Sequence, residues 1–98
     1  MDDALKSYLD VESRITRWPT RKMKQDRAPL LAYLAAKFAL GTFYNEKQVN
    51  ELLKQWHIFD DWALLRRELI EQGYLQRKAD GQVYWRTSGE RSYQDKEF

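Results

Sequence analysis

The sequence predicts a small α+β domain, namely a winged helix-turn-helix with a three-helix core, a short N-terminal strand or helix and a C-terminal β-hairpin. Two observations support this prediction. Three segments in the middle of the chain place apolar residues at helical spacing, and after Gly73 the apolar period changes from about 3.6 residues to 2. The connection between residues 56 and 60 is short, as a helix-turn-helix requires.

The 98 residues suit one domain, which we divide into three parts. Residues 1–13 form an acidic leader that could hold a short helix, and residues 14–86 form the winged-helix domain. The alternating pattern at 14–18 suits a short strand that Pro19 closes. Residues 87–98 are polar and are expected to fray.

The first strong helix is predicted over residues 25–40. Pro29 is tolerated only in a first turn, so Asp26 is the expected N-cap, and Gly41 is expected to end the helix. The apolar residues that share one face of this helix are Leu30, Leu31, Leu34 and Phe38.

The second and third helices are predicted to begin after Asn45 and after Asp60, because Asn and Asp are favoured N-caps. The third helix should run to about Gln72, and Gly73 then supplies the positive φ that a helix end commonly needs. The expected buried stripes are Val49, Leu52, Leu53 and Trp56 in the second helix and Trp62, Leu65 and Leu69 in the third, with Ala63 and Ile70 beside them.

The hairpin is predicted from strands at 74–77 and 82–86, joined by an Asp80-Gly81 turn. Its basic and aromatic residues have two interpretations. Either they contact nucleic acid, or Val83 and Trp85, or Tyr84, cover the core while the charges keep the hairpin soluble.

Three blocks of the sequence carry a resemblance to a known family. They are YNEKQVNELLKQWH (44–57), DWALLRRELIEQGYLQR (61–77) and YWR (84–86). Together with the preceding helix they resemble the winged-helix-like domain of unknown function 2087 over residues 14–86. The departures from the usual pattern are Asn45 for Thr, Gln48 for Glu, Trp62 for Tyr and Leu64 for Thr. The resemblance implies a bacterial protein of transcription-regulator type, and it supplies no catalytic residue.

The residue types of the sequence give little indication of a catalytic site or a metal site. Without Cys there is no thiolate ligand or nucleophile, and the single histidine, His57, has only Asp60 and Asp61 nearby in sequence. Asp60 is also the expected N-cap of the third helix, which gives it a structural role. We therefore expect no enzyme activity, no metal, no cofactor and no small-molecule substrate.

No apolar run approaches the roughly 20 residues that a membrane span needs. The first residues also lack the basic and apolar regions of a signal peptide. We therefore expect a cytoplasmic protein with no membrane partner.

The net charge is only +2, but the chain changes sign sharply between residues 1–13 and residues 14–27. This basic segment is either a solvated arm or an arm that contacts phosphates. The predicted nucleic-acid-binding residues are Arg14, Arg17, Arg21, Lys22 and Lys24 in this segment, Arg67 in the third helix, and Arg77, Lys78 and Arg86 in the hairpin.

The third helix is a poor groove reader by charge, since residues 60–71 hold four carboxylates against two arginines. Arg66 falls at the edge of the buried face, and we expect it to bond a carboxylate of the second helix, Glu46 or Glu51. Arg67 points outward, where it could contact DNA or pair with Glu71. Asn45, Asp60, Arg66 and Gly73 are thus the predicted structural residues.

The sequence holds four Trp, six Tyr and four Phe, more than a core of this size needs. Some of these rings should be exposed or should meet a partner. The favoured function is a non-catalytic regulator-like domain that binds double-stranded DNA through the basic arm and the hairpin. The alternative is a module for homodimerisation or for docking to a regulator protein.

Overall fold

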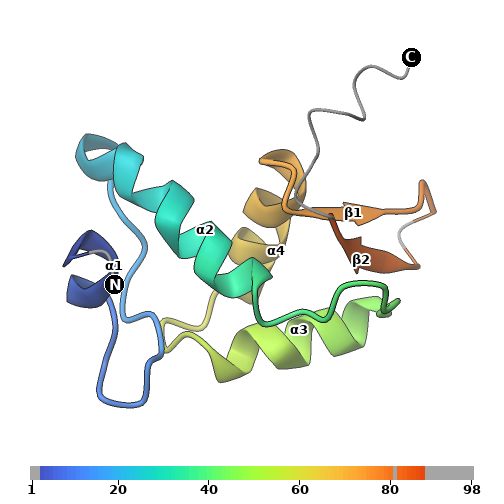
Figure 1. Cartoon of the computed structure of the whole chain (residues 1–98), viewed down its shortest axis with the longest axis horizontal. Coiled ribbons are helices and arrows are strands. Elements are labelled where there is room, and N and C mark those ends of the chain that lie inside the picture. The colour runs from blue at the N-terminus through green and yellow to red at the C-terminus, as the bar shows by residue number, and fades with distance from the viewer. Residues whose placement is uncertain (1–2, 81, 88–98) are drawn as a thin grey trace.

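A computed structural model of the chain describes residues 3–80 and 82–87. Figure 1 shows the elements in chain order: α1 (Asp3–Ser7), the 3₁₀ helix η1 (Arg21–Asp26), α2 (Arg27–Ala35), α3 (Glu46–Gln55), α4 (Trp62–Glu71), β1 (Leu75–Arg77) and β2 (Tyr84–Arg86). The predicted α+β class is confirmed. The packing of α2, α3 and α4 beside a two-stranded antiparallel sheet is consistent with a winged-helix layout.

The core lies between α2, α3 and α4 and is closed at one end by the hairpin. Each helix contributes side chains with no exposed surface, such as Leu34, Leu53 and Leu65. β2 adds Tyr84 and the segment before η1 adds Ile15, both almost fully buried. Burial of one such side chain stabilises the fold by about 1.5–3 kcal/mol.

Helix α2 is shorter than the sequence predicts, and Asp26 occupies its N-cap position as predicted, but without a capping bond. The Asp26 side chain caps no helix N–H, because its Oδ2 accepts a hydrogen bond from the Tyr8 hydroxyl at 2.9 Å. The helix ends at Ala35, and the chain then turns so that Phe38 enters the core. Gly41, with φ of +77°, lies in the loop beyond this turn and does not end the helix.

Helix α3 begins where the sequence predicts it. The Asn45 side chain accepts from the Gln48 N–H, and the Gln48 side chain accepts from the Asn45 N–H, both at 2.8 Å. This reciprocal capping box satisfies two backbone donors at the helix start, which fixes both the start and the phase of the apolar stripe.

Helix α4 is capped by Asp61, so the prediction of Asp60 was wrong by one residue. The Asp61 carboxylate accepts from the Leu64 N–H at 3.2 Å, while Asp60 adopts a positive φ of 57° in the preceding turn. Asp tolerates this left-handed conformation better than most residues. The helix ends as predicted, since Gly73 follows it with φ of 84°.

The hairpin pairs Leu75 with Arg86 and Arg77 with Tyr84, in strands shorter than predicted. Tyr44, between α2 and α3, extends the sheet by a bridge, since its N–H and carbonyl both bond the backbone of Tyr84. The predicted turn includes Gly81, which lies outside the described residues.

The boundary between domain and tail moves by one residue. The sequence predicts that Thr87 belongs to the tail, but its hydroxyl donates to the Gly73 carbonyl at 2.7 Å and its N–H donates to the Tyr74 carbonyl at 3.0 Å. Thr87 therefore fastens the end of β2 to the end of α4. The rest of the predicted tail, 88–98, lies outside the described residues.

The predicted leader helix is present as α1, and Tyr8 after it is buried. The strand predicted at 14–18 is reduced to isolated bridges that join Ile15 to Leu9 and to His57. Within residues 3–80 and 82–87, no helix has the length and apolar character of a membrane span.

Candidate nucleic-acid interface

An open groove of about 340 Å³ lies between α4 and the hairpin. The residues that line it are Ala63, Arg66, Arg67, Ile70, Glu71, Arg77 and Tyr84. Two of its arginines come from α4 and the third from β1, so the packing of the hairpin against α4 brings them to one place. Among the described residues that line this groove, Glu71 is the only carboxylate.

Arg66 is held by α3. One nitrogen of its guanidinium donates to the Asn50 side-chain oxygen, and the same nitrogen lies 3.7 Å from a Glu46 carboxylate oxygen. The Arg66 side chain is only 22% exposed. The predicted structural role and the predicted partner Glu46 are both found, whereas Glu51 pairs with Lys54 instead.

Arg67 and Arg77 are exposed, and neither side chain has a hydrogen bond or an ion pair with any described residue. The predicted pair between Arg67 and Glu71 is therefore not formed. Lys78 follows Arg77 and is exposed as well. The groove thus presents two guanidinium groups whose donors face solvent.

Arg86, in contrast, uses its guanidinium within the fold. Its Nη1 donates to the Phe38 carbonyl at 3.2 Å, and the residue is half-buried. The bond ties β2 to the turn after α2. Of the three basic residues predicted in the hairpin, the structure leaves Arg77 and Lys78 free to meet a ligand.

Tyr84 adds a feature that sequence reasoning missed. The residue is 1% exposed, and its hydroxyl is buried without a hydrogen-bond partner among the described residues. A buried polar group left unsatisfied costs about 1–3 kcal/mol. The alternating pattern of the strand predicts that either Tyr84 or the pair Val83 and Trp85 covers the core. It does not predict that the Tyr84 hydroxyl lacks a hydrogen-bond partner.

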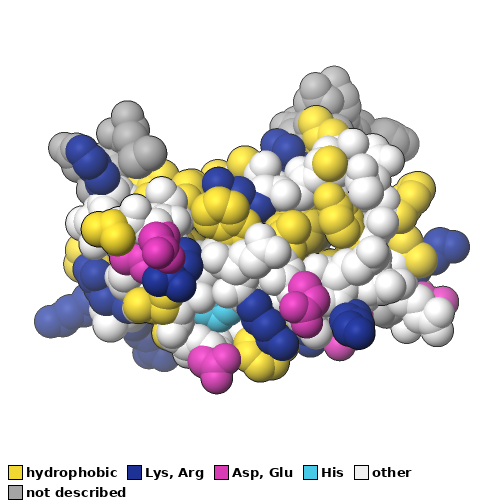
Figure 2. All heavy atoms as spheres, turned by 90° about the horizontal axis from the view of Figure 1, so that it is seen from below, with side chains coloured by type: hydrophobic (Ala, Val, Ile, Leu, Met, Phe, Trp, Pro, Cys, Tyr) yellow, Lys and Arg dark blue, Asp and Glu magenta, His cyan; other side chains and the backbone are white. Residues whose placement is uncertain are grey.

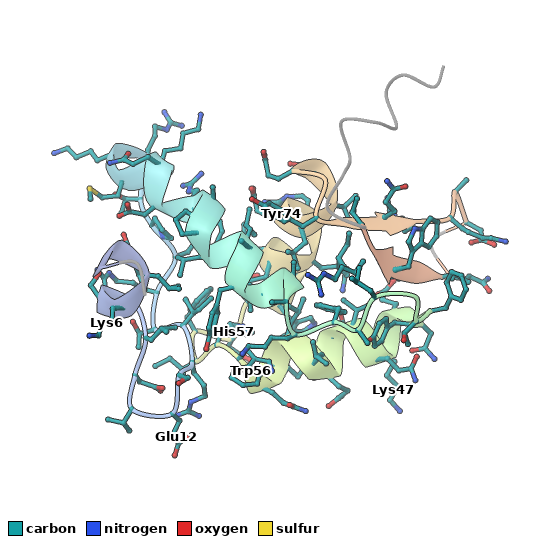
Figure 3. All side chains as sticks on the ribbon, viewed as in Figure 1. Lys6, Glu12, Lys47, Trp56, His57 and Tyr74 are labelled. Carbon is teal, nitrogen blue, oxygen red and sulfur yellow. The ribbon has the colours of Figure 1, made fainter. Side chains whose placement is uncertain are left out.

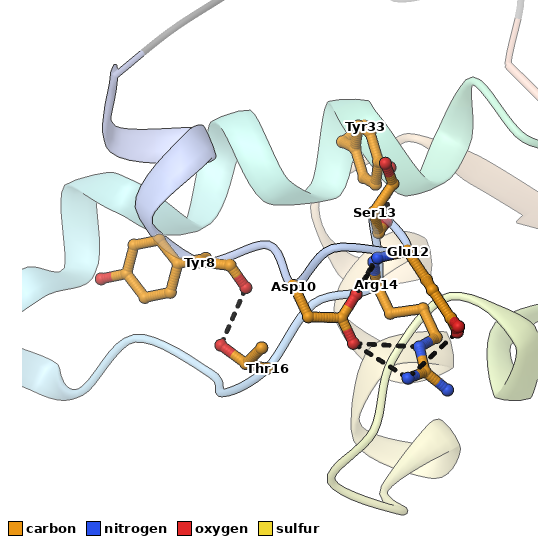
Figure 4. Close-up of polar contacts among 7 residues, drawn as sticks. All are labelled: Tyr8, Asp10, Glu12, Ser13, Arg14, Thr16 and Tyr33. Carbon is orange, nitrogen blue, oxygen red and sulfur yellow. Dashed lines mark hydrogen bonds and ion pairs between the residues drawn. The ribbon is translucent and has the colours of Figure 1, made fainter.

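The basic segment at 14–27 is packed against the domain. The Arg14 guanidinium pairs with Asp10 at 3.0 Å and with Glu12 at 3.3 Å, as Figure 4 shows. Arg17 lies over the Tyr8 ring, 4.2 Å from its centroid, and Arg27 donates twice to the Pro19 carbonyl. Most of the arginines in this segment therefore hold the fold together.

Asp10 organises the start of this segment. Its Oδ1 accepts from the N–H groups of Arg14 and Glu12, both at 2.9 Å, and Oδ2 accepts from Arg14 Nε at 3.0 Å. The backbone N–H of Arg14 is the chief cause that lowers the pKa of this carboxyl, helped by the Glu12 N–H and the Arg14 guanidinium and opposed by burial.

The remaining basic residues of the segment, Arg21, Lys22 and Lys24, are exposed on η1. Figure 1 shows η1 and the hairpin at opposite ends of the longest axis, which measures 39 Å. On the α3 side, shown in Figure 2, cationic and acidic side chains are interspersed. The structure therefore does not join the predicted arm and the hairpin into one basic surface.

His57 lies in the connection between α3 and α4. Its ring lies below α2, where α3 ends (Figure 3), and is 4% exposed. Nδ1 donates to the Leu53 carbonyl at 2.6 Å, while Nε2 accepts from the Asp61 N–H at 3.0 Å. Both ring nitrogens are thus used by the backbone. Among the described residues, no cluster of three His, Cys, Asp or Glu could hold a metal ion.

Comparison with known proteins gives one match. The family model described as "Uncharacterized protein conserved in bacteria (DUF2087)" matches residues 14–86. No curated protein and no solved structure matches the chain. The matched range begins at the packed basic segment and ends at β2, so it includes the groove with all of its lining residues.

Proposed function

The chain belongs to the DUF2087 family of bacterial proteins, and on that premise we propose that it is a non-catalytic, regulator-type domain that binds double-stranded DNA through the groove between α4 and the hairpin. One observation carries the proposal. Arg67 and Arg77 come from different elements, line the same open groove and have no partner among the described residues.

The chemistry of the groove suits phosphate. Arg presents a planar set of N–H donors that matches two phosphate oxygens, and it remains charged at every physiological pH. The Tyr84 hydroxyl, which lacks a partner, belongs to the residue at the floor of this groove. A small movement of the Tyr84 side chain towards a phosphate oxygen would give this hydroxyl a hydrogen-bond acceptor. The hydrogen bond gained in this way supports an anionic ligand.

The same groove favours contact with the DNA backbone over base reading. The exposed positions along α4 are Ala63, Arg67 and Glu71, so its outward face offers one donor group and one carboxylate. The phosphates on both sides of the major groove would repel this carboxylate, which opposes deep entry of α4 into the groove. We therefore expect affinity that depends weakly on DNA sequence and strongly on salt.

A fluorescence titration of a labelled, mixed-sequence duplex tests the proposal. Two to three phosphate contacts should give a log–log slope of about −2 to −3 between affinity and salt concentration. Binding that is absent at the lowest salt, or that does not weaken as salt rises, would contradict DNA binding by this groove.

A second candidate function, homodimerisation, rests on a different surface. Phe43 is 68% exposed and Leu40 is 54% exposed, and the rings of Phe43 and Trp85 meet edge to face with 5.9 Å between their centroids. Light scattering over a range of protein concentrations separates the two candidates. A dimer that binds no duplex at low salt, and that Phe43→Ser converts to a monomer, would favour homodimerisation.

A further inference from the structure

The side chain of Lys37 lies between two aromatic rings. Its Nζ is 3.9 Å from the centroid of the Trp56 ring and 4.4 Å from that of the Tyr33 ring. The two rings are nearly perpendicular, at 86°, with centroids 6.3 Å apart. Two ring faces thus meet one ammonium group, which is the arrangement by which aromatic cages bind organic cations.

Both walls of this corner are fixed by the fold. Tyr33 belongs to α2, and its hydroxyl donates to the Ser13 carbonyl at 2.6 Å. Trp56 caps the end of α3, and its carbonyl accepts from the N–H of the buried Ile15 at 2.8 Å. Lys37 comes from the turn after α2. The rings are therefore positioned independently of the cation that they hold.

The ring faces are the main partners of the Lys37 ammonium group. No carboxylate among the described residues lies within 4.0 Å of it. A primary ammonium is strongly hydrated, so contact with rings deprives it of water. A methylated ammonium loses less hydration on entering such a corner and keeps the attraction to the rings.

We propose that the corner formed by Tyr33 and Trp56 is a binding site for a methylated ammonium group, and that Lys37 occupies it in the absence of ligand. All three residues are half-buried, so the corner is open to solvent on one side. The site shares no residue with the groove, and this inference is independent of DNA binding.

Lys37 then acts as a tethered competitor. A tethered group has an effective concentration in the millimolar range or above, so a free ligand should bind the native chain weakly. Removal of the competitor leaves both walls in place. We expect Lys37→Ala to bind a quaternary ammonium at least about tenfold more tightly than the native chain does.

The test is an NMR titration of the native chain and of Lys37→Ala with choline, following the indole signal of Trp56. The control ligand is the neutral isostere of choline, in which carbon replaces nitrogen. The expected result is that choline shifts this signal, more tightly in Lys37→Ala, while the isostere does not. Equal shifts with both ligands, or no shift with choline in Lys37→Ala, would overturn the proposal.

Two variants of Tyr33 separate binding from folding. Tyr33→Phe keeps the ring and loses only the hydrogen bond to Ser13, so we expect choline binding to persist. Tyr33→Leu removes the wall, and binding should fall by about tenfold in a chain whose amide spectrum remains dispersed. Unchanged binding in Tyr33→Leu would overturn the proposal.

The source of the ammonium group is decided by a parallel titration of Lys37→Ala with a short peptide that carries trimethyllysine. Tighter binding of the peptide than of choline identifies a modified protein as the source. Equal or weaker binding identifies a small quaternary ammonium compound. Either result presupposes the cation site, whereas binding of the unmethylated peptide with equal affinity would contradict it.

Discussion

The segment Arg14–Arg27 and the groove between α4 and the hairpin are both rich in arginine, yet they use it in opposite ways. In the first, Arg14 pairs with two carboxylates, and Arg27 bonds a backbone carbonyl. In the second, Arg67 and Arg77 have no such partners among the described residues. The density of positive charge along a sequence therefore does not show which charges are available to a ligand.

We expect the largest effect from a substitution that disrupts the packing of the segment Arg14–Arg27. Ile15 is fully buried and its backbone bonds Trp56 and Ile58. Ile15→Ala should lower the free energy of unfolding by about 2–5 kcal/mol, measured by urea denaturation. The control is Val11→Ala, whose side chain is fully exposed and should change stability by less than about 0.5 kcal/mol. Equal stability of the two variants would mean that the segment is a free arm.

A smaller effect separates the two kinds of arginine. Arg27→Ala leaves the buried Pro19 carbonyl without its two donors and removes a guanidinium 5.5 Å from the Trp18 ring centroid. We expect a loss of about 1–3 kcal/mol in unfolding free energy. Arg67→Ala should change stability by less than about 0.5 kcal/mol. Equal losses in urea denaturation would remove the distinction between the regions.

The smallest effect concerns the pH dependence of the first region. The lowered pKa of Asp10 means that its ionised form stabilises the fold at pH above its usual value of 3.8, and that this contribution is lost as pH falls through the folded-state pKa. Asp10→Asn should therefore be less stable than the native chain at neutral pH. The difference in unfolding free energy between the native chain and Asp10→Asn should shrink as the pH falls. A difference that stays constant from pH 7 to strongly acidic pH would contradict the stabilising role of the ionised Asp10.

The sequence predicts the elements that depend on local chemistry. The N-cap at Asn45 and the positive φ at Gly73 depend on residues within a few positions of each other, so spacing reveals them. Helical phase also placed Arg66 at the edge of the buried face, where it meets Glu46. In each case a single helix turn or helix face decides the outcome.

The errors arise where a distant contact competes with a local one. Asp26 is a good N-cap by type, but Tyr8 engages its carboxylate. The cap of α4 falls at Asp61, whose N–H donates to the ring of His57 four residues earlier, and the backbone of His57 is in turn bridged to the distant Ile15. The packing of the basic segment depends on bridges from Ile15 to a residue more than forty positions away. Spacing along the chain contains no signal for such contacts.

The sequence predicts some basic residues of the groove region, but not the groove itself. Arg67, Arg77 and Lys78 were singled out by residue type and by helical phase, but η1 was expected to act with them. Their separation along the long axis follows from the tertiary arrangement of α2 and α4, which no sequence pattern specifies. The unpartnered Tyr84 hydroxyl likewise appears only once the hairpin is packed.

The most direct test compares the salt dependence of duplex binding in three proteins: the native chain, Arg67→Ala/Arg77→Ala and Arg21→Ala/Lys22→Ala. We predict that the groove variant lowers the magnitude of the log–log slope by about 2, because two phosphate contacts are lost. The η1 variant should keep the native slope. An unchanged slope in the groove variant together with a reduced slope in the η1 variant would contradict the assignment of DNA binding to the groove.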